Sequence, residues 1–196
     1  MPDEFDEFDD RYYERFYGDG GTHDAARVAH IATAVHEMAA WWDVPIRSVR
    51  DVGAGMGMWR DWYAANHPGV RVRSIDVSRY ACTTWGHERR DISTWKPSSK
   101  FDLVVCHSVL QYLDDEPVMA AIGNLAAATR RVMYLELPTT ADFRHVVDRD
   151  HTDLDVHHRT GAWYRRLLTE HFQQAGAGLW VRRGEVPLFE LEAAAR

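Results

Sequence analysis

This chain of 196 residues has few cysteines, no long apolar run and no excess of positive charge. Its two cysteines, Cys82 and Cys106, lack metal-type spacing and do not suggest a disulfide framework, which predicts a reducing, cytoplasmic setting. No apolar stretch approaches the roughly 20 residues that a membrane-spanning helix requires. No basic start followed by an apolar segment is visible either, so we expect neither a signal peptide nor a membrane partner.

The sequence also lacks the net positive charge that is usual in proteins that bind nucleic acid, although arginines cluster among acidic neighbours. The formal net charge is −7, whereas proteins that grip a phosphate backbone usually have a basic face. Six of the first ten residues are acidic, and we expect a solvated tail there. Nucleic acid is therefore a disfavoured partner. The eight tryptophans and eight tyrosines provide rings for a core or for a pocket that binds a flat or apolar ligand.

Hydrophobic periodicity predicts strands that alternate with helices. The expected strands are 48–52, 70–77, 87–92, 101–107 and 131–137. The expected helices are 11–17, 24–42, 57–66, 78–85 and 116–129. The last of these has Val118, Met119, Ile122, Leu125 and Ala126 on its inward face. A further helix is expected to begin at the cap Thr160 and to carry Trp163, Leu167, Leu168 and Phe172. Residues 179–182 and 186–191, around Arg183 and Gly184, are typical of a hairpin. The order predicts an α/β three-layer sandwich, with a mostly parallel seven-stranded sheet and a C-terminal antiparallel hairpin.

Glycines 53, 55 and 57 lie between the first expected strand and the next helix. Glycine permits the tight turn and lets a ligand lie against the main chain, while the helix start offers unpaired N–H groups. A dinucleotide-binding fingerprint spaces its last two glycines by two residues. Here Met58 takes that last position, so the loop alone indicates only a nucleotide-binding fold.

Two acidic residues follow the next strands. Asp76 ends the second strand at about the offset where ribose-binding units place a carboxylate, although a surface aspartate could also cap the next turn. Asp91 follows the third strand within Arg90-Asp91-Ile92, where a plain loop acid is the alternative.

The spacing Asp51-x-Gly53-x-Gly55-x-Gly57, followed by Asp76, Asp91 and the segment 101–113, resembles class I S-adenosylmethionine-dependent methyltransferases of the small-molecule type. The resemblance covers about residues 48–137 and implies S-adenosylmethionine as cofactor and S-adenosylhomocysteine as product. The cofactor-binding residues that it implies are Asp51, Gly53, Ala54, Gly55, Gly57, Asp76, Val77, Arg90, Asp91, Ile92 and His107.

The sequence has no internal repeat and no low-complexity linker, so we expect one methyltransferase domain over residues 1–196. Its parts would be an N-terminal helical cap (1–45), the cofactor-binding core (46–137), a substrate-region insertion (138–160), and a final helix with the hairpin (161–196). Enzymes that methylate amino groups of nucleic-acid bases have an Asn/Asp-Pro-Pro-Tyr/Phe motif after the fourth strand. This chain has Cys106-His107-Ser108-Val109 there, which disfavours that activity.

Methyl transfer requires mainly that nucleophile, carbon and sulfur be held in line, and a base is needed only if the nucleophile arrives protonated. His107 ends the fourth strand and is the candidate catalytic base, with packing near the cofactor as its alternative. The candidate substrate residues are Tyr13, Tyr17, Tyr112, His151 and His157. Tyr12, Tyr13 and Tyr17 would belong to a lid or to aromatic packing.

The segment 148–158 is rich in aspartate and histidine. It could be a hydrated loop, contact a polar substrate or ligate a metal, and we assign no metal to it.

We therefore expect transfer of a methyl group to oxygen or nitrogen of a small molecule. A protein or RNA methyltransferase and a non-catalytic S-adenosylmethionine-binding module remain alternatives, with a nicotinamide-dependent oxidoreductase less favoured. The acceptor and the oligomeric state stay open, because fold alone does not define them.

Overall fold

The computed structural model describes residues 5, 7–17 and 24–194. Their strands form one seven-stranded sheet in the order β3-β2-β1-β4-β5-β7-β6. The strands are β1 (Ser48–Val52), β2 (Arg71–Asp76), β3 (Glu88–Arg89), β4 (Phe101–His107), β5 (Thr129–Glu136), β6 (Phe172–Gly176) and β7 (Leu179–Arg182). Pairs from β3 to β5 are parallel, while β7 runs antiparallel to β5 and β6. The predicted fold class is confirmed.

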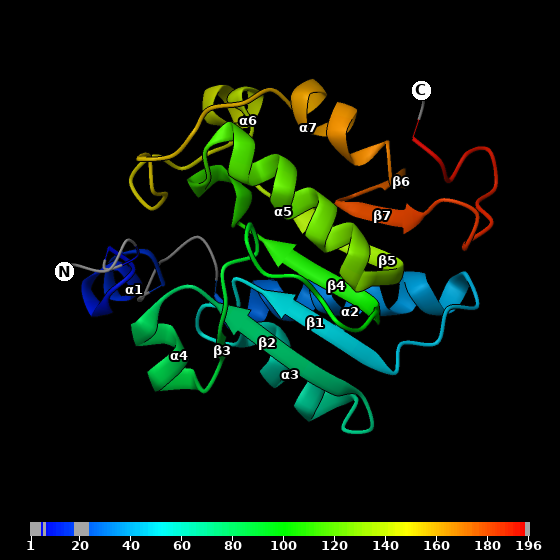
Figure 1. Ribbon diagram of the computed structural model, residues 1–196, viewed down its shortest axis with the longest axis horizontal. Coiled ribbons are helices and arrows are strands. Elements are labelled where there is room, and N and C mark those ends of the chain that lie inside the picture. Colours follow the sequence, from blue (N-terminus) through cyan, green and yellow to red (C-terminus); the bar gives the residue numbers. More distant parts are fainter. Residues whose placement is uncertain (1–4, 6, 18–23, 195–196) are drawn as a thin grey trace.

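Helices cover both faces of this sheet (Figure 1). They are α1 (Asp10–Tyr17), α2 (Ala25–Trp41), α3 (Met58–Asn66), α4 (Arg79–Trp85), the 3-10 helix η1 (Leu110–Tyr112), α5 (Asp115–Ala128), α6 (Thr140–His145) and α7 (Gly161–Leu168). Helices α2 and α3 pack on one face around Val35 and Tyr63. Helices α5 and α7 pack on the other around Leu125 and Leu168. The two apolar layers hold the strands between them.

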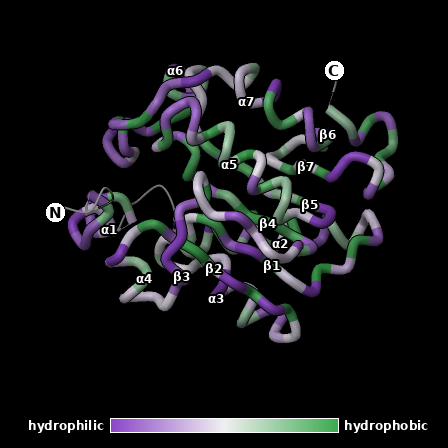
Figure 2. Tube along the Cα trace, viewed as in Figure 1, coloured by the Kyte–Doolittle hydropathy of each residue, from purple (hydrophilic) through white to green (hydrophobic). Residues whose placement is uncertain are grey.

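The central strands form where the sequence is apolar on both sides. All five residues of β1 and the first six of β4 are buried, as expected for parallel strands covered by helices on both faces. Figure 2 shows hydrophobic residues along β4, whereas hydrophilic residues gather in α1. Strand β2 is exposed at its start and buried only from Ser74 to Asp76, as its arginines predict. The predicted bounds of β1 and β4 are confirmed.

The C-terminal hairpin consists of other residues than we predicted. Strand β7 pairs with β6, the strand that precedes it. The turn between them contains Ala177 and Gly178, and both residues adopt positive φ. Residues 186–191 form no strand. Phe172, which we expected on a helix face, begins β6 and is fully buried. Strand β6 was not predicted because the polar Gln173 and Gln174 obscure its pattern. The hairpin prediction was therefore wrong about which strand pairs with β7.

Two smaller predictions also need correction. Met119 was expected inward from α5 but is 48% exposed. The third strand contains only Glu88 and Arg89 instead of six residues. Residues 138–160 include the short helix α6, which begins with a capping box between Thr139 and Asp142. Such reciprocal caps satisfy main-chain N–H groups at a helix start.

The strand order reverses between β1 and β4, and their carboxyl ends lie side by side. Ligands of parallel α/β sheets bind in the crevice at such a point. Helix α1 lies beyond the ends of β1, β2 and β4 (Figure 1). Within the described ranges no helix is long and apolar enough to cross a membrane.

Candidate functional site

The glycine loop after β1 is shaped by three residues with positive φ: Gly53 at 65°, Gly55 at 53° and Gly57 at 79°. A side chain at Gly53 would be strained, and its Cβ would lie 2.2 Å from a methyl group of Val109. Gly53 and Ala54 donate main-chain hydrogen bonds to the carbonyl oxygen of Ile75. The loop therefore stays close to the sheet, and Val109 packs against its main chain where a side chain at position 53 would lie.

Asp51, at the end of β1, is a buried carboxylate. It is 2% exposed, and its Oδ2 atom has no hydrogen-bond partner among the described residues. Burial is the main cause that raises the pKa of Asp51 from 3.8 to about 7, and the negative charge of Asp76 is the second. A buried acceptor without a donor is costly, so this atom marks a place where a ligand could supply an N–H group.

Asp76 connects the glycine loop to the turn after β2. Its Oδ2 accepts a hydrogen bond from the main-chain N–H of Gly55, and its Oδ1 accepts one from Ser78, both at 2.8 Å. Burial raises the pKa of Asp76, although these hydrogen bonds lower it in part. A carboxylate has about four acceptor positions, so Asp76 retains capacity for the hydroxyl groups of a ribose.

The three residues that follow β3, Arg90, Asp91 and Ile92, have different environments. Ile92 is 3% exposed and belongs to the apolar core. Asp91 is half-buried and accepts hydrogen bonds from the main chain and hydroxyl group of Ser93. Arg90 is exposed and forms an ion pair with Glu88 at 2.7 Å. The side chain of Arg90 is thus directed to the surface, although its main-chain N–H bonds to the carbonyl oxygen of Asp76.

Two cavities meet at the carboxyl ends of β1 and β4. The smaller, of about 30 Å³, is lined by Asp51, Trp59 and the glycine loop. The larger, of about 610 Å³, lies among α1, α2, β5 and the segment 142–153. The two cavities share four of their wall residues, which are Tyr17, Val28, His107 and Ser108. A ligand in one cavity would therefore be next to a ligand in the other.

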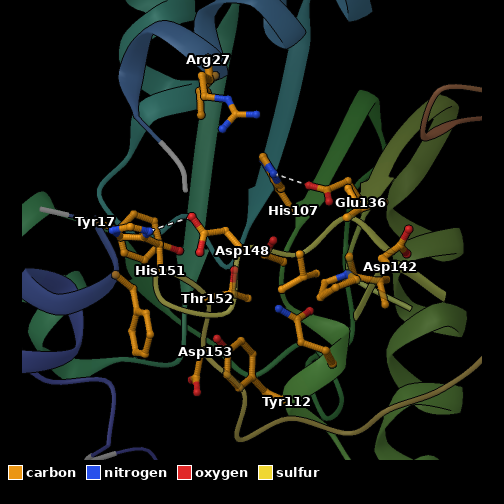
Figure 3. A pocket seen from close by; sticks show the side chains of 18 of the residues that line it. Tyr17, Arg27, His107, Tyr112, Glu136, Asp142, Asp148, His151, Thr152 and Asp153 are labelled. Atoms are coloured by element: carbon orange, nitrogen blue, oxygen red, sulfur yellow. Dashed lines mark hydrogen bonds and ion pairs between the residues drawn. The ribbon is translucent and has the colours of Figure 1, made fainter. Parts of the chain in front are cut away.

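His107 stands between the cavities and connects two elements. Its Nε2 atom lies 2.6 Å from Oε2 of Glu136, the last residue of β5 (Figure 3). Its Nδ1 atom lies 3.3 Å from Nε1 of Trp59. An indole N–H can only donate, so Nδ1 accepts and the proton of a neutral ring resides on Nε2, where it is donated to Glu136. The His107 ring thus holds Glu136, whose side chain is 43% exposed.

Helix α1 covers the glycine loop with aromatic side chains. The ring of Tyr13 lies 3.7 Å from the position of a Cβ atom on Gly55, and it also stacks on Tyr80 and meets Trp85 edge-on. The hydroxyl group of Ser78 donates to the carbonyl oxygen of Phe8 at 2.6 Å. Aromatic packing and this hydrogen bond therefore hold the N-terminal segment and α1 over the turn that follows β2.

Of the expected substrate residues, Tyr17, Tyr112 and His151 line the larger cavity. The Tyr112 hydroxyl group lies 2.7 Å from that of Tyr12, so η1 and α1 are joined across the cavity wall. Tyr13 lies over the glycine loop instead. His157 is near Asp114 at 3.3 Å and is not among the cavity-lining residues.

The aspartate- and histidine-rich segment forms local contacts. His151 and Asp148 are 2.8 Å apart, and this contact raises the pKa of His151 and lowers that of Asp148. Within the described parts of the chain, no three histidine, cysteine or acidic side chains are grouped so that they could hold a metal ion.

Arg159 lies outside the larger cavity but bonds to residues on both sides of Gln111 and Tyr112, which line it, and sequence reasoning missed this role. Its guanidinium donates to Asp115, to the carbonyl oxygens of Leu110 and Leu113, and to the hydroxyl group of Tyr164. These bonds connect the segment before α7 to η1 and α5. No local pattern marks such a role, because the partners lie about 5 to 49 positions away.

Sequence reasoning also missed Glu136, Trp59, Gln111 and Asp153. Glu136 could have been found, because it is a carboxylate at the carboxyl end of a strand next to β4, where ligands bind. Trp59 follows the glycine loop and looked like a core residue. Gln111 and Asp153 occupy a 3-10 turn and a loop, whose spatial positions have no periodic signature.

No family model matches this chain, and no curated protein matches its sequence. Solved structures do match. Magnesium protoporphyrin IX methyltransferase from Synechocystis, crystallised with bound S-adenosylhomocysteine, is 20% identical, with 91% of this chain and 97% of that chain covered and a TM-score of 0.61. DesVI of Streptomyces venezuelae is 15% identical, with coverage of 79% and 90% and a TM-score of 0.59.

A third structure is an S-adenosylmethionine-dependent methyltransferase from Clostridium acetobutylicum. It is 11% identical, with coverage of 88% and 96% and a TM-score of 0.62. These similarities cover between 79% and 91% of the chain. The chain has the fold of S-adenosylmethionine-dependent methyltransferases, as its sequence predicted.

Proposed function

We propose that this protein is an enzyme that transfers a methyl group from S-adenosylmethionine to oxygen or nitrogen of a small molecule. The observation that carries this proposal is the common wall of the two cavities at His107 and Ser108. A cofactor against the glycine loop and an acceptor in the larger cavity would meet there. Reaction by direct displacement requires such proximity, with the reacting atoms about 3–3.5 Å apart.

Residues of the smaller cavity, together with residues at the end of β2 and after β3, suit S-adenosylmethionine. The unpartnered Oδ2 atom of Asp51 suits the ammonium group of the cofactor's methionine part, and the main chain at Gly53 and Gly55 suits close contact. Asp76 would hold the ribose hydroxyl groups, and Asp91 with Ile92 would hold adenine, as the resemblance implies. The cofactor supplies a methyl group on a positively charged sulfur.

Glu136 and His107 would handle the acceptor's proton. The Glu136 carboxylate is half-exposed and lines the larger cavity, so it can accept a proton from an acceptor group. His107 would orient this carboxylate through its Nε2 hydrogen bond, while Trp59 holds the ring in that tautomer. We thus propose His107 as the positioning residue and Glu136 as the base.

A small-molecule acceptor agrees with the dimensions of the larger cavity. Its volume of about 610 Å³ falls within the range of small-molecule sites, about 300–1,000 Å³. Its wall is built from side chains of α1, α2, β5 and the segment 142–153, so the acceptor would be surrounded by the fold.

Methyl transfer from S-adenosylmethionine with a labelled methyl group tests the proposal. The purified protein would be incubated with a metabolite extract, with total protein and with total RNA in parallel. We expect label in low-mass products, lost in Asp76→Ala and retained in Glu116→Gln, whose exposed side chain lies outside the site. Label only in protein or RNA would support the alternative acceptors, and no label in any fraction would contradict the proposal.

A further inference from the structure

The larger cavity is lined by more negative than positive groups. Four carboxylates line it, against one arginine; they are Glu136, Asp142, Asp148 and Asp153. Asp142 is engaged at the start of α6 and Asp148 with His151. Figure 3 shows Arg27 entering from α2, on the far side of His107 from Asp153.

The other two carboxylates also accept hydrogen bonds from neighbouring groups. Glu136 accepts from the His107 ring, and Asp153 accepts from the main-chain N–H of Asp155 at 3.0 Å. They belong to different walls, because Glu136 ends β5 and Asp153 lies in the segment after α6 (Figure 3). With four carboxylates against one arginine and two histidines, the lining of the cavity attracts a cation.

Aromatic rings form much of the remaining wall. They are Tyr12, Phe16, Tyr17, Tyr112 and Tyr134. Burial raises the pKa of all four tyrosines well above its ordinary value, so their hydroxyl groups stay neutral. The faces of such rings attract ammonium groups. The lining therefore combines an apolar enclosure with affinity for positive charge.

Gln111 gives a second, independent indication of a ligand. Its side chain lines the same cavity and is 3% exposed, and its Oε1 atom has no hydrogen-bond partner among the described residues. Buried amide oxygens are nearly always paired. An acceptor of this kind matches a ligand that donates N–H bonds.

We propose that the methyl acceptor is an amine, bound as its ammonium ion between Glu136, Asp153 and the aromatic rings, and deprotonated by Glu136. This inference rests on the proposed methyltransferase function and narrows its oxygen-or-nitrogen acceptor to nitrogen. An ammonium group suits this cavity because it has several N–H donors and a positive charge.

The proton and electron balance is simple. Glu136 takes one proton from the ammonium ion, which leaves the nitrogen with a lone pair. The nitrogen–carbon bond forms from that pair as the carbon–sulfur bond breaks, and the sulfur keeps the electrons of the broken bond. The methylated nitrogen is again positively charged; it releases a proton to water, as does Glu136.

Binding of three compounds that have the same skeleton tests the acceptor class. Phenethylamine, phenethyl alcohol and phenylacetate carry a cationic, a neutral and an anionic end on one ring and chain. Calorimetric titration into the protein saturated with S-adenosylhomocysteine would compare them. We expect phenethylamine to bind at least about tenfold more tightly than the alcohol, because its ammonium group forms charge-assisted hydrogen bonds with carboxylates.

The variant Glu136→Gln should remove most of this preference and leave binding of S-adenosylhomocysteine unchanged. Asp153→Asn should reduce the preference by a smaller factor. Glu116→Gln removes the same charge from an exposed position on α5 and should preserve the preference. These variants separate a local carboxylate from the general charge of the protein.

Equal affinity for the three compounds, including no measurable affinity for any, overturns the amine proposal, as does a preference for the alcohol or the acid. An unchanged preference in Glu136→Gln overturns the role of Glu136. Failure of the underlying methyltransferase function has a different signature, because S-adenosylhomocysteine would then not bind at all.

Discussion

The imidazole of His107 lies between the indole of Trp59 and the carboxylate of Glu136, with Nε2 of His107 2.6 Å from Oε2 of Glu136. This arrangement joins the start of α3 to the ends of β4 and β5. It directs the Nδ1 lone pair of the histidine to Trp59 and its proton to Glu136. A histidine held in this way orients a carboxylate, as positioning residues of other sites do.

Two substitutions of His107 distinguish a positioning residue from a base. Glutamine retains an N–H group that can reach Glu136, whereas phenylalanine retains only ring volume. We therefore expect His107→Gln to keep about tenfold more kcat than His107→Phe, measured with any acceptor found in the labelled-methyl assay. Equal losses in both variants would contradict the positioning role and would favour direct proton transfer by the imidazole.

The pH dependence of stability tests the environment of Asp51. Its pKa in the folded protein, about 7, lies above the ordinary value of 3.8 because of burial and the nearby Asp76. The folded protein thus binds a proton that the unfolded chain has released, and the free energy of unfolding falls as the pH rises from about 4 to about 7.

Asp51→Asn should lose this dependence. The free energy of unfolding of the variant, relative to that of wild type, should be higher at pH 8 than at pH 5 by about 1 kcal/mol or more. One pKa unit corresponds to about 1.36 kcal/mol. Urea denaturation of both proteins at the two pH values measures the gain. The same stability difference at both values would show that Asp51 is ionised throughout.

Arg159 should be important for stability as well as for the cavity. Its side chain is 7% exposed and ion-paired with Asp115 at 2.7 Å. Arg159→Ala leaves several carbonyl oxygens without a donor, and we expect a loss of about 3 kcal/mol in the free energy of unfolding. Arg166→Ala, at an exposed position of α7, is the control and should change stability little. A loss below about 0.5 kcal/mol for Arg159→Ala would contradict this role.

The position of α1 predicts that cofactor entry is gated. Tyr13 packs on the glycine loop and against Trp85, so α1 has to move before an adenosine group can approach Asp76. We expect Tyr13→Ala to bind S-adenosylhomocysteine about threefold faster or more in stopped-flow tryptophan fluorescence, because loop and terminus motions of this kind control access. An exposed control, Phe189→Ala, should keep the wild-type rate. A slower or unchanged rate in Tyr13→Ala would exclude this gate.

The sequence allowed good prediction of the parts of the fold that depend on local pattern. Strands β1 and β4 have the predicted bounds because both are continuous apolar segments between turn-forming residues. The caps Ser78 and Thr160 begin α4 and α7 as their short polar side chains suggest. The hairpin was predicted with the wrong partner strand, because the polar pattern of β6 does not alternate.

The site was harder to predict because its residues come from distant segments. Neither His151 nor His157 has a local feature that decides which one faces the cavity, because this depends on the path of the chain between β5 and α7. The pairing of His107 with Glu136 follows from the register of β4 against β5. Such a register is not encoded in either strand alone.

Calorimetric titration of the wild-type protein with S-adenosylhomocysteine tests the central claim most directly. We predict binding at one site per chain, strongly weakened in Asp76→Ala because Asp76 supports both the glycine loop and the ribose position. No detectable heat and no thermal stabilisation at millimolar ligand would contradict the assignment of this crevice as an S-adenosylmethionine site.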